Sequence, residues 1–149
     1  MSLQHPVVCE QIGHRPLFIG SSRAAAEGAT EETFSDLITV SSYSLPRTTE
    51  FIPLVDGVDV EYSQFKKAVE AAREAYQQGG KVLVQCEVGI SRSAAIIAAV
   101  LAAEEAQTFE EALREVRQYR QRASPRQPLR ECAKRYLREE ATSSDPLFV

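Results

Sequence analysis

The sequence contains few of the residues that mark secreted or metal-binding proteins. Its 149 residues include three cysteines, Cys9, Cys86 and Cys132, which are odd in number and far apart. This pattern fits neither a disulfide framework nor paired zinc ligands, and it favours a reducing compartment such as the cytoplasm. The two histidines, His5 and His14, have no partner pattern, so neither is expected to be catalytic or to bind a metal.

Long apolar runs and an excess of positive charge are also missing. No apolar run reaches the ~18 residues that a membrane-spanning helix needs, and the first residues lack the charged and apolar regions of a signal peptide. The net charge of -4 argues against a general affinity for nucleic acid or anionic membranes, because such binding needs basic patches. We therefore expect a cytoplasmic protein with no nucleic-acid or membrane partner.

The length and composition predict one globular domain. A chain of 149 residues with 44% hydrophobic content can bury a core of its own, and no linker or repeat divides it. We expect an N-terminal arm and first strand over residues 1–15, the main domain over 16–140 and a C-terminal tail over 141–149. Nothing in the sequence specifies an oligomer, so a monomer is expected.

Strand patterns dominate the first third of the chain. Short apolar and β-branched runs predict strands at 7–9, 16–20, 37–42 and 51–55, the last two buried. A short helix is expected over 21–28.

Helix patterns follow, with one more strand among them. Helical spacing from Asp59 to about residue 78 predicts an amphipathic helix with Asp59 as its N-cap. The run 81–86 predicts a strand, and 93–103, apolar on every side, predicts a buried helix. Thr108 and Glu111 match a capping box that opens another helix, and a last helix is expected over about 128–140. This order predicts an α/β fold in which helices flank a central, mostly parallel sheet.

One short segment combines a cysteine, an arginine and a serine between the predicted strand 81–86 and the buried helix. It reads Cys86-Glu87-Val88-Gly89-Ile90-Ser91-Arg92-Ser93. Because the chain passes from strand through loop to helix, the backbone N–H groups of the loop converge beside the positive end of a helix. We therefore expect an anion-binding loop formed by Glu87, Val88, Gly89, Ile90, Ser91 and Arg92.

The same spacing joins two other cysteines to arginines, so spacing alone does not decide. Cys9 and Arg15 lead through Pro16 into another strand, with no helix N-terminus to hold an anion. Cys132 lies in a predicted helix, where six positions turn about 600° at ~3.6 residues per turn, so Arg138 points to another side. Both pairs are interpreted as coincidental.

The residue types in the loop suit attack on a phosphate ester. The loop N–H groups and the helix end favour Cys86 as a thiolate nucleophile, and Arg92 offers a planar fork to two phosphate oxygens. Gly89 can adopt backbone angles closed to other residues, and the Ser93 hydroxyl can donate to the sulfur. The alternative for Cys86 is a small buried residue that ends a strand.

Phosphate transfer also needs a proton for the leaving oxygen and later a base for water. Asp56 is the candidate, because it directly follows the predicted strand 51–55 and Gly57 gives its loop freedom to move. Asp59 is the competitor, although its position suits helix capping. Asp56 could instead start an Asx-turn at the strand end.

Residues well beyond the loop resemble the dual-specificity phosphatases of the cysteine-based protein tyrosine phosphatase superfamily. That family's signature is cysteine, five residues, arginine, then serine or threonine. The stretches 16–21, 52–56, 80–84 and 110–113 also look like family segments, so the resemblance spans roughly residues 16–138. By this resemblance Cys86, Arg92, Ser93 and Asp56 take the nucleophile, phosphate-binding, thiolate-assisting and general-acid roles, with no metal or cofactor.

The chain departs from the family pattern on both sides of Cys86 and in one later loop. Gln85 stands where histidine is usual, and Glu87 adds a negative charge beside the sulfur. Where the family often has proline then asparagine, this chain has Pro125 and Arg126. The arginines of residues 114–130 are interpreted as a solvated helix face and loop.

The resemblance implies hydrolysis of phosphotyrosine in proteins or peptides through a phosphocysteine intermediate. Because the chain is short, hydrolysis of phosphoserine and phosphothreonine is expected as well. One alternative is a non-protein ester such as a phosphoinositide, a nucleotide or RNA, which the acidic Glu87 and the apolar Val88 and Ile90 disfavour. A second alternative is a non-catalytic module that binds phosphorylated partners, which Gln85 and Glu87 keep open.

Overall fold

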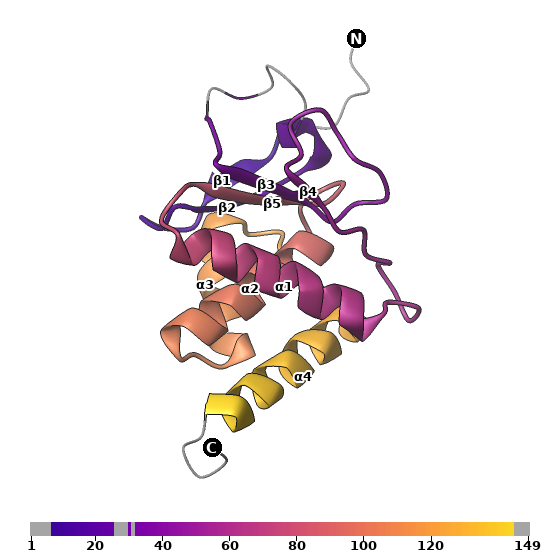
Figure 1. Cartoon of the computed structure of the whole chain (residues 1–149), viewed down its shortest axis with the longest axis vertical. Helices are drawn as coiled ribbons and strands as arrows, with labels where there is room; N and C mark the ends of the chain where they lie inside the picture. Colours follow the sequence, from indigo (N-terminus) through magenta and orange to yellow (C-terminus); the bar gives the residue numbers. More distant parts are fainter. Residues whose placement is uncertain (1–6, 26–29, 31, 145–149) are drawn as a thin grey trace.

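A twisted sheet lies above a layer of helices in the computed structural model, which describes residues 7–25, 30 and 32–144 (Figure 1). Within these residues the strands are β1 (Cys9–Gln11), β2 (Leu17–Gly20), β3 (Asp36–Thr39), β4 (Glu50–Phe51) and β5 (Val82–Gln85). Their order is β1-β2-β5-β3-β4. Only the β1–β2 pair of this sheet is antiparallel, so the predicted mostly parallel sheet is confirmed.

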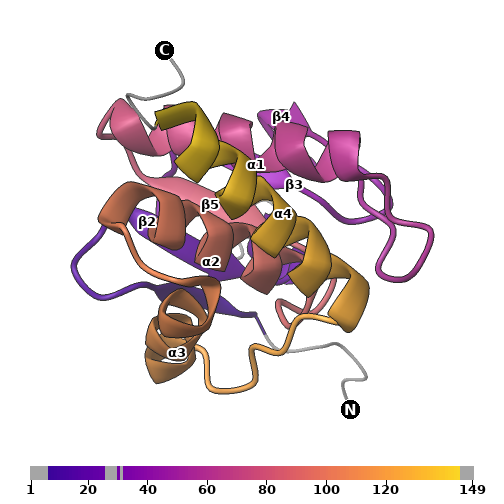
Figure 2. The same ribbon diagram turned by 90° about the horizontal axis from the view of Figure 1, so that it is seen from below.

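The helices cover the sheet unequally. On one face lie α1 (Tyr62–Gln77), α2 (Arg92–Glu105), α3 (Phe109–Tyr119) and α4 (Gln127–Ser144) (Figure 2). On the other face lies η1 (Ser22–Ala25), a single turn of 3-10 helix (Figure 1). None of the helices in the described ranges combines the length and the apolar character that crossing a membrane requires.

The alternation of side chains along the strands explains these two layers. Val82 and Val84 of β5 belong to the main core under the sheet, whereas Leu83 between them packs with Phe18 and Leu37 on the η1 side. Successive strand residues point to opposite faces, so a strand buried on both sides is apolar throughout. The central position of β5 is therefore set by its own sequence.

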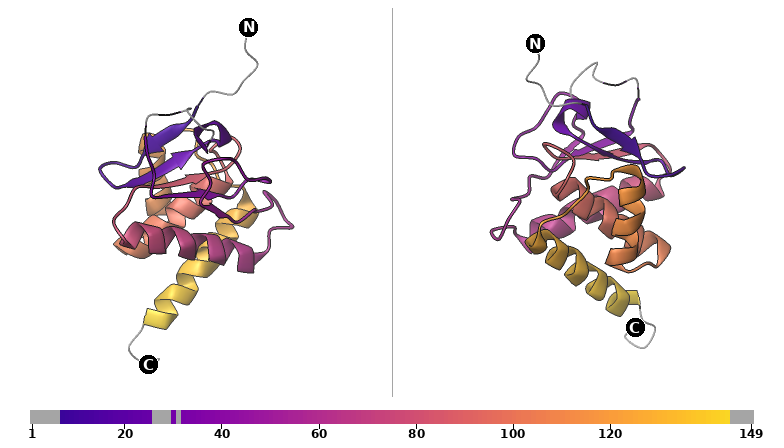
Figure 3. Two further views of the ribbon diagram at one scale, coloured as in Figure 1. Left: turned by 45° about the horizontal axis from the view of Figure 1, so that its top comes forward. Right: turned by 180° about the vertical axis from the view of Figure 1, so that it is seen from behind.

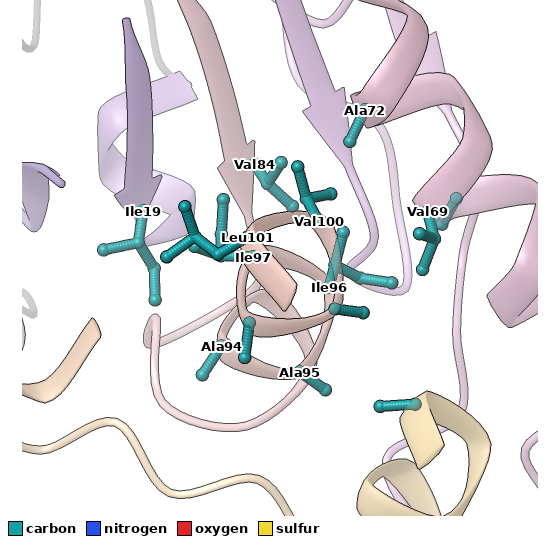
Figure 4. Close-up of a cluster of buried hydrophobic side chains, with 14 of the residues drawn as sticks. Ile19, Val69, Ala72, Val84, Ala94, Ala95, Ile96, Ile97, Val100 and Leu101 are labelled. Atoms are coloured by element: carbon teal, nitrogen blue, oxygen red, sulfur yellow. The ribbon is translucent and has the colours of Figure 1, made fainter. Parts of the chain in front are cut away.

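Helix α2 is the centre of the helical layer. It packs against α1, α3, α4 and the sheet, and every residue from Arg92 to Ala102 is buried. Ile97 and Leu101 lie between the strand residues Ile19 and Val84 in the core (Figure 4). Its alanines let the neighbouring elements approach closely, and Figure 3 shows α2 enclosed between the sheet and the other helices. The predicted buried helix is confirmed.

Several expected element ends need correction. The expected buried strand 51–55 is wrong in length, because β4 ends at Phe51 and both of its residues are exposed, whereas Ile52 and Leu54 of the expected run are buried. The chain nevertheless follows β3 a little further, since the Ile52 N–H donates to the Thr39 carbonyl at 2.9 Å. The N-cap of α1 is Glu61 and not Asp59, and no side chain caps it.

Other expectations fall close to the observed elements. The first strand lies at Cys9–Gln11 instead of 7–9, and within the described part of the expected helix over 21–28, residues 21–25, Ser22–Ala25 form a helical turn. The capping box of Thr108 and Glu111 is present in full. His5, residues 26–28 of that expected helix and residues 145–149 of the tail lie outside the described residues.

Candidate active site

The segment between β5 and α2 places Cys86 at the start of a helix. Cys86 is 1% exposed, and its Sγ lies 3.1 Å from the Ser93 Oγ and 3.4 Å from the Ser93 backbone nitrogen. Ser91 is the N-cap residue and Arg92 the first residue of α2. A sulfur that faces the free N–H groups of a helix end is stabilised as an anion.

Gly89 lets this loop curl against β2. Its φ of +67° lies in the left-handed region, and a Cβ placed there would be 3.0 Å from the Gly20 carbonyl oxygen. The Cys86 N–H donates to that same oxygen at 3.3 Å, and the Ser22 N–H donates to the Glu87 carbonyl at 3.1 Å. The loop is therefore fixed by backbone contacts with β2 and η1, and only glycine fits at position 89.

Arg92 is a buried cation with unused hydrogen-bonding capacity. The residue is 9% exposed, and its Nη1 donates to the Leu54 carbonyl at 3.2 Å. Its Nε is buried and finds no hydrogen-bond acceptor in the part of the chain that the structure describes. A buried donor without a partner is costly, so an anion that accepts from this guanidinium would relieve the cost.

Asp56 lies at the edge of the loop and Asp59 does not. The Ser91 Oγ donates to Asp56 Oδ1 at 2.6 Å, and the Asp56 side chain is 26% exposed. Asp59 is exposed and lines a depression of about 290 Å³ next to Leu54 and Val55. Of the two carboxylates considered from the sequence, the structure brings only Asp56 into contact with the loop.

The contacts of Arg120 show that the interpretation of the later arginines as solvated is wrong for this residue. Its guanidinium donates to the Gly89 carbonyl at 3.0 Å and to the Val88 carbonyl at 2.9 Å. Burial, with the neighbouring Arg122, lowers the pKa of Arg120 below its usual value. These bonds tie two carbonyls of the loop to the C-terminal end of α3. Nothing in the arginine spacing indicated this role.

Gln85 makes its hydrogen bond on the side of β3. It is fully buried, and its Nε2 donates to the Ser41 Oγ at 3.3 Å. Its Oε1 has no hydrogen-bond partner among the described residues. The amide nitrogen therefore bonds to Ser41, two residues beyond the end of β3.

Comparisons with known proteins agree with this geometry. Residues 41–136 match the family model described as dual specificity phosphatase, catalytic domain. The dual specificity protein phosphatase 1 of Arabidopsis thaliana is 33% identical over 117 residues, which cover 73% of this chain and 59% of the relative. The chain thus spans less than two thirds of that relative's length.

Solved structures show the same fold. A mouse putative dual specificity phosphatase complexed with zinc tungstate is 25% identical, with a TM-score of 0.77 over 97% of this chain and 94% of that one. PTPMT1 in complex with PI(5)P is 22% identical, with a TM-score of 0.73 over 92% of this chain and 99% of that one.

The fold, the matched family model and the cysteine loop at the head of α2 place the chain in the class of cysteine-based phosphatases. The family model covers well over half of the sequence. The chain belongs to the dual-specificity phosphatase family.

Proposed function

We propose that the chain hydrolyses phosphotyrosine, phosphoserine and phosphothreonine in cytoplasmic proteins through a phosphocysteine intermediate, with residues 16–140 as the catalytic unit. The observation that carries the proposal is the contact of the Cys86 sulfur with both the hydroxyl and the backbone nitrogen of Ser93 at the head of α2. In the proposed mechanism the Ser93 N–H and hydroxyl both donate to the sulfur in its nucleophilic form, the thiolate.

In the first step the Cys86 thiolate attacks phosphorus while the bond to the ester oxygen breaks. Arg92 and the loop N–H groups of residues 87–92 hold the three phosphate oxygens, on which charge accumulates. Asp56 gives its proton to the departing oxygen, so the alcohol or phenol leaves neutral. The products of this step are phosphocysteine and the dephosphorylated side chain.

In the second step water attacks the phosphocysteine. The Asp56 carboxylate takes a proton from that water, the sulfur–phosphorus bond breaks and inorganic phosphate leaves. Ser93 donates to the sulfur as it becomes a thiolate again. Apart from the substrate and water, every group in the proposed reaction is a side chain or a backbone N–H of this chain.

The competing substrate class is a non-protein ester. The neighbour whose structure holds PI(5)P shares the fold at 22% identity, so it supports the fold alone. Glu87 and the 38% exposed Val88 in this loop favour a substrate with few charges, such as a single phosphorylated side chain.

The first test is phosphate release from p-nitrophenyl phosphate across about pH 5 to 8 without metal and with a thiol reductant. Turnover should be lost in Cys86→Ser and retained in Cys132→Ser, the control for removal of a buried thiol. Turnover that survives in Cys86→Ser would contradict the cysteine mechanism. An inactive wild type that still binds vanadate would indicate a phosphate-binding module instead.

The second test compares a phosphotyrosine peptide, a phosphothreonine peptide and a phosphoinositide as substrates of the wild type. The proposal predicts a higher kcat/KM for both peptides than for the lipid headgroup. The reverse order would assign the protein to non-protein esters.

A further inference from the structure

Three segments far apart in the sequence meet at the Asp56 carboxylate. The Ser91 Oγ donates to Asp56 Oδ1 at 2.6 Å, and the Arg126 backbone N–H donates to the same Ser91 Oγ at 3.0 Å. The Arg126 Nε lies 3.3 Å from Asp56 Oδ2. Both carboxylate oxygens are thus held, one from the phosphate loop and one from the segment that leads into α4.

The backbone around Arg126 is fixed without its side chain. The Ser124 N–H donates to the Ile90 carbonyl at 2.8 Å, and the Arg130 Nε donates to the Pro125 carbonyl at 2.7 Å. Truncation of the Arg126 side chain should therefore leave this segment in place against the phosphate loop.

The Asp56 segment has little packing of its own. Val58 is 86% exposed, and a Cβ placed at Gly57 would have no atom within 4 Å. Hydrogen bonds of Leu54 and Val60 hold the backbone on either side, and the contacts from Ser91 and Arg126 hold the carboxylate itself.

We infer that Arg126 is a positioning residue that holds the Asp56 carboxyl over the phosphate loop before the substrate arrives. The inference rests on the proposed function, in which Asp56 transfers the proton. Arg126 stands where family members often carry asparagine, whose side chain is uncharged and shorter. In this chain the general acid is kept in place by an ion pair.

A guanidinium has two opposite effects on a general acid, because it orients the carboxyl but also disfavours its protonation. The Arg126 side chain is 67% exposed and its contact is 3.3 Å long, so water screens the effect of its charge. Orientation has the larger effect, since misplacing a catalytic group by about 1 Å can cost ~100-fold in rate. Loss of Arg126 should therefore slow proton transfer.

The first experiment measures kcat of Arg126→Ala on two substrates. With a phosphotyrosine peptide, a poor leaving group, kcat should fall about three- to ten-fold, and with an activated aryl phosphate it should change by less than about two-fold. Arg126→Lys should recover part of the loss. The control is Arg122→Ala, an exposed arginine with no bond to Asp56 in the described structure, which should match the wild type.

The second experiment repeats Arg126→Ala in an Asp56→Asn background. If Arg126 acts through Asp56, Arg126→Ala should cause no further loss of kcat in the Asp56→Asn background. The inference is overturned by an equal loss on both substrates, by a loss that persists in Asp56→Asn, or by a rise in kcat. If Asp56→Asn itself shows no dependence on the leaving group, then the general-acid role fails and the inference fails with it.

Discussion

The pattern of cysteine, five residues and arginine occurs three times in this chain, in three different structural settings. Cys9 begins the outer strand β1, and its Arg15 forms ion pairs with Glu105 at 2.6 Å and Glu115 at 3.4 Å. Cys132 and the exposed Arg138 both lie within α4. Of the three, only the Cys86 segment spans a strand end, a loop and a helix start, so the surroundings and not the spacing distinguish the candidate site.

The largest difference should appear between the Cys86 pair and the Cys132 pair when the arginine of each is replaced by lysine. Arg92→Lys should lower kcat/KM about 100- to 1,000-fold, because an ammonium cannot reproduce the planar fork for two phosphate oxygens. Arg138→Lys should leave kcat/KM unchanged. Steady-state kinetics on p-nitrophenyl phosphate checks both, and a similar loss in the two variants would contradict the comparison.

The next largest effect concerns a group that only the Cys86 site possesses. Asp56→Ala should slow a phosphotyrosine peptide by about 100-fold or more, because the departing phenoxide then receives no proton. An activated aryl phosphate, whose leaving group needs no proton, should lose much less. Equal losses on the two substrates would exclude Asp56 as the acid.

A smaller effect should follow from a change in loop shape. Gly89→Ala should destabilise the protein by about 1–2 kcal/mol, because a side chain at φ +67° is strained and its Cβ would press on the Gly20 carbonyl. The control is Gly57→Ala, where the added Cβ meets no atom within 4 Å, so its stability should match the wild type. Urea denaturation of both variants measures the difference in their free energies of unfolding. Equal values would show that the loop relaxes around the new side chain and would contradict the prediction.

The smallest effect concerns the two other cysteines. Burial raises the pKa of the Cys9 and Cys132 thiols above the ordinary value for cysteine. A raised pKa leaves less thiolate at a given pH, so in the Cys86→Ser variant iodoacetate should react with these thiols only at a higher pH than with free cysteine. Mass spectrometry of the alkylated peptides tests this. Reaction at or below the pH for free cysteine would contradict it.

The sequence predicted the parts of the site that depend on neighbouring residues. The strand, loop and buried helix around Cys86 follow from an apolar run, a glycine and a second apolar run, and the Thr108 capping box is equally local. Asp59 was a wrong N-cap because α1 begins three residues later, after Glu61.

The contacts between distant segments could not be predicted in the same way. Ser91 and Asp56 are 35 residues apart, as are Arg126 and Ser91, and each contact depends on the path of the intervening chain. Arg120 and Arg126 resemble solvated arginines in the sequence, because a single sequence does not show which exposed loop lies against which. The wrong bounds of the expected strand 51–55 and the exposure of Phe51 have the same cause, since the place of β4 at the edge of the sheet is a property of the whole fold.

The burial of α2 also determines how the protein can open. Amide hydrogens in a helix enclosed on every side exchange with solvent only when the whole domain unfolds, whereas exposed loops exchange through small local motions. Arg92 is the first residue of that helix, so we expect its backbone to stay in place for as long as the domain is folded. The position of the proposed phosphate-binding arginine would then share the lifetime of the native state, whereas the exposed loop around Val58 is expected to exchange through local motions.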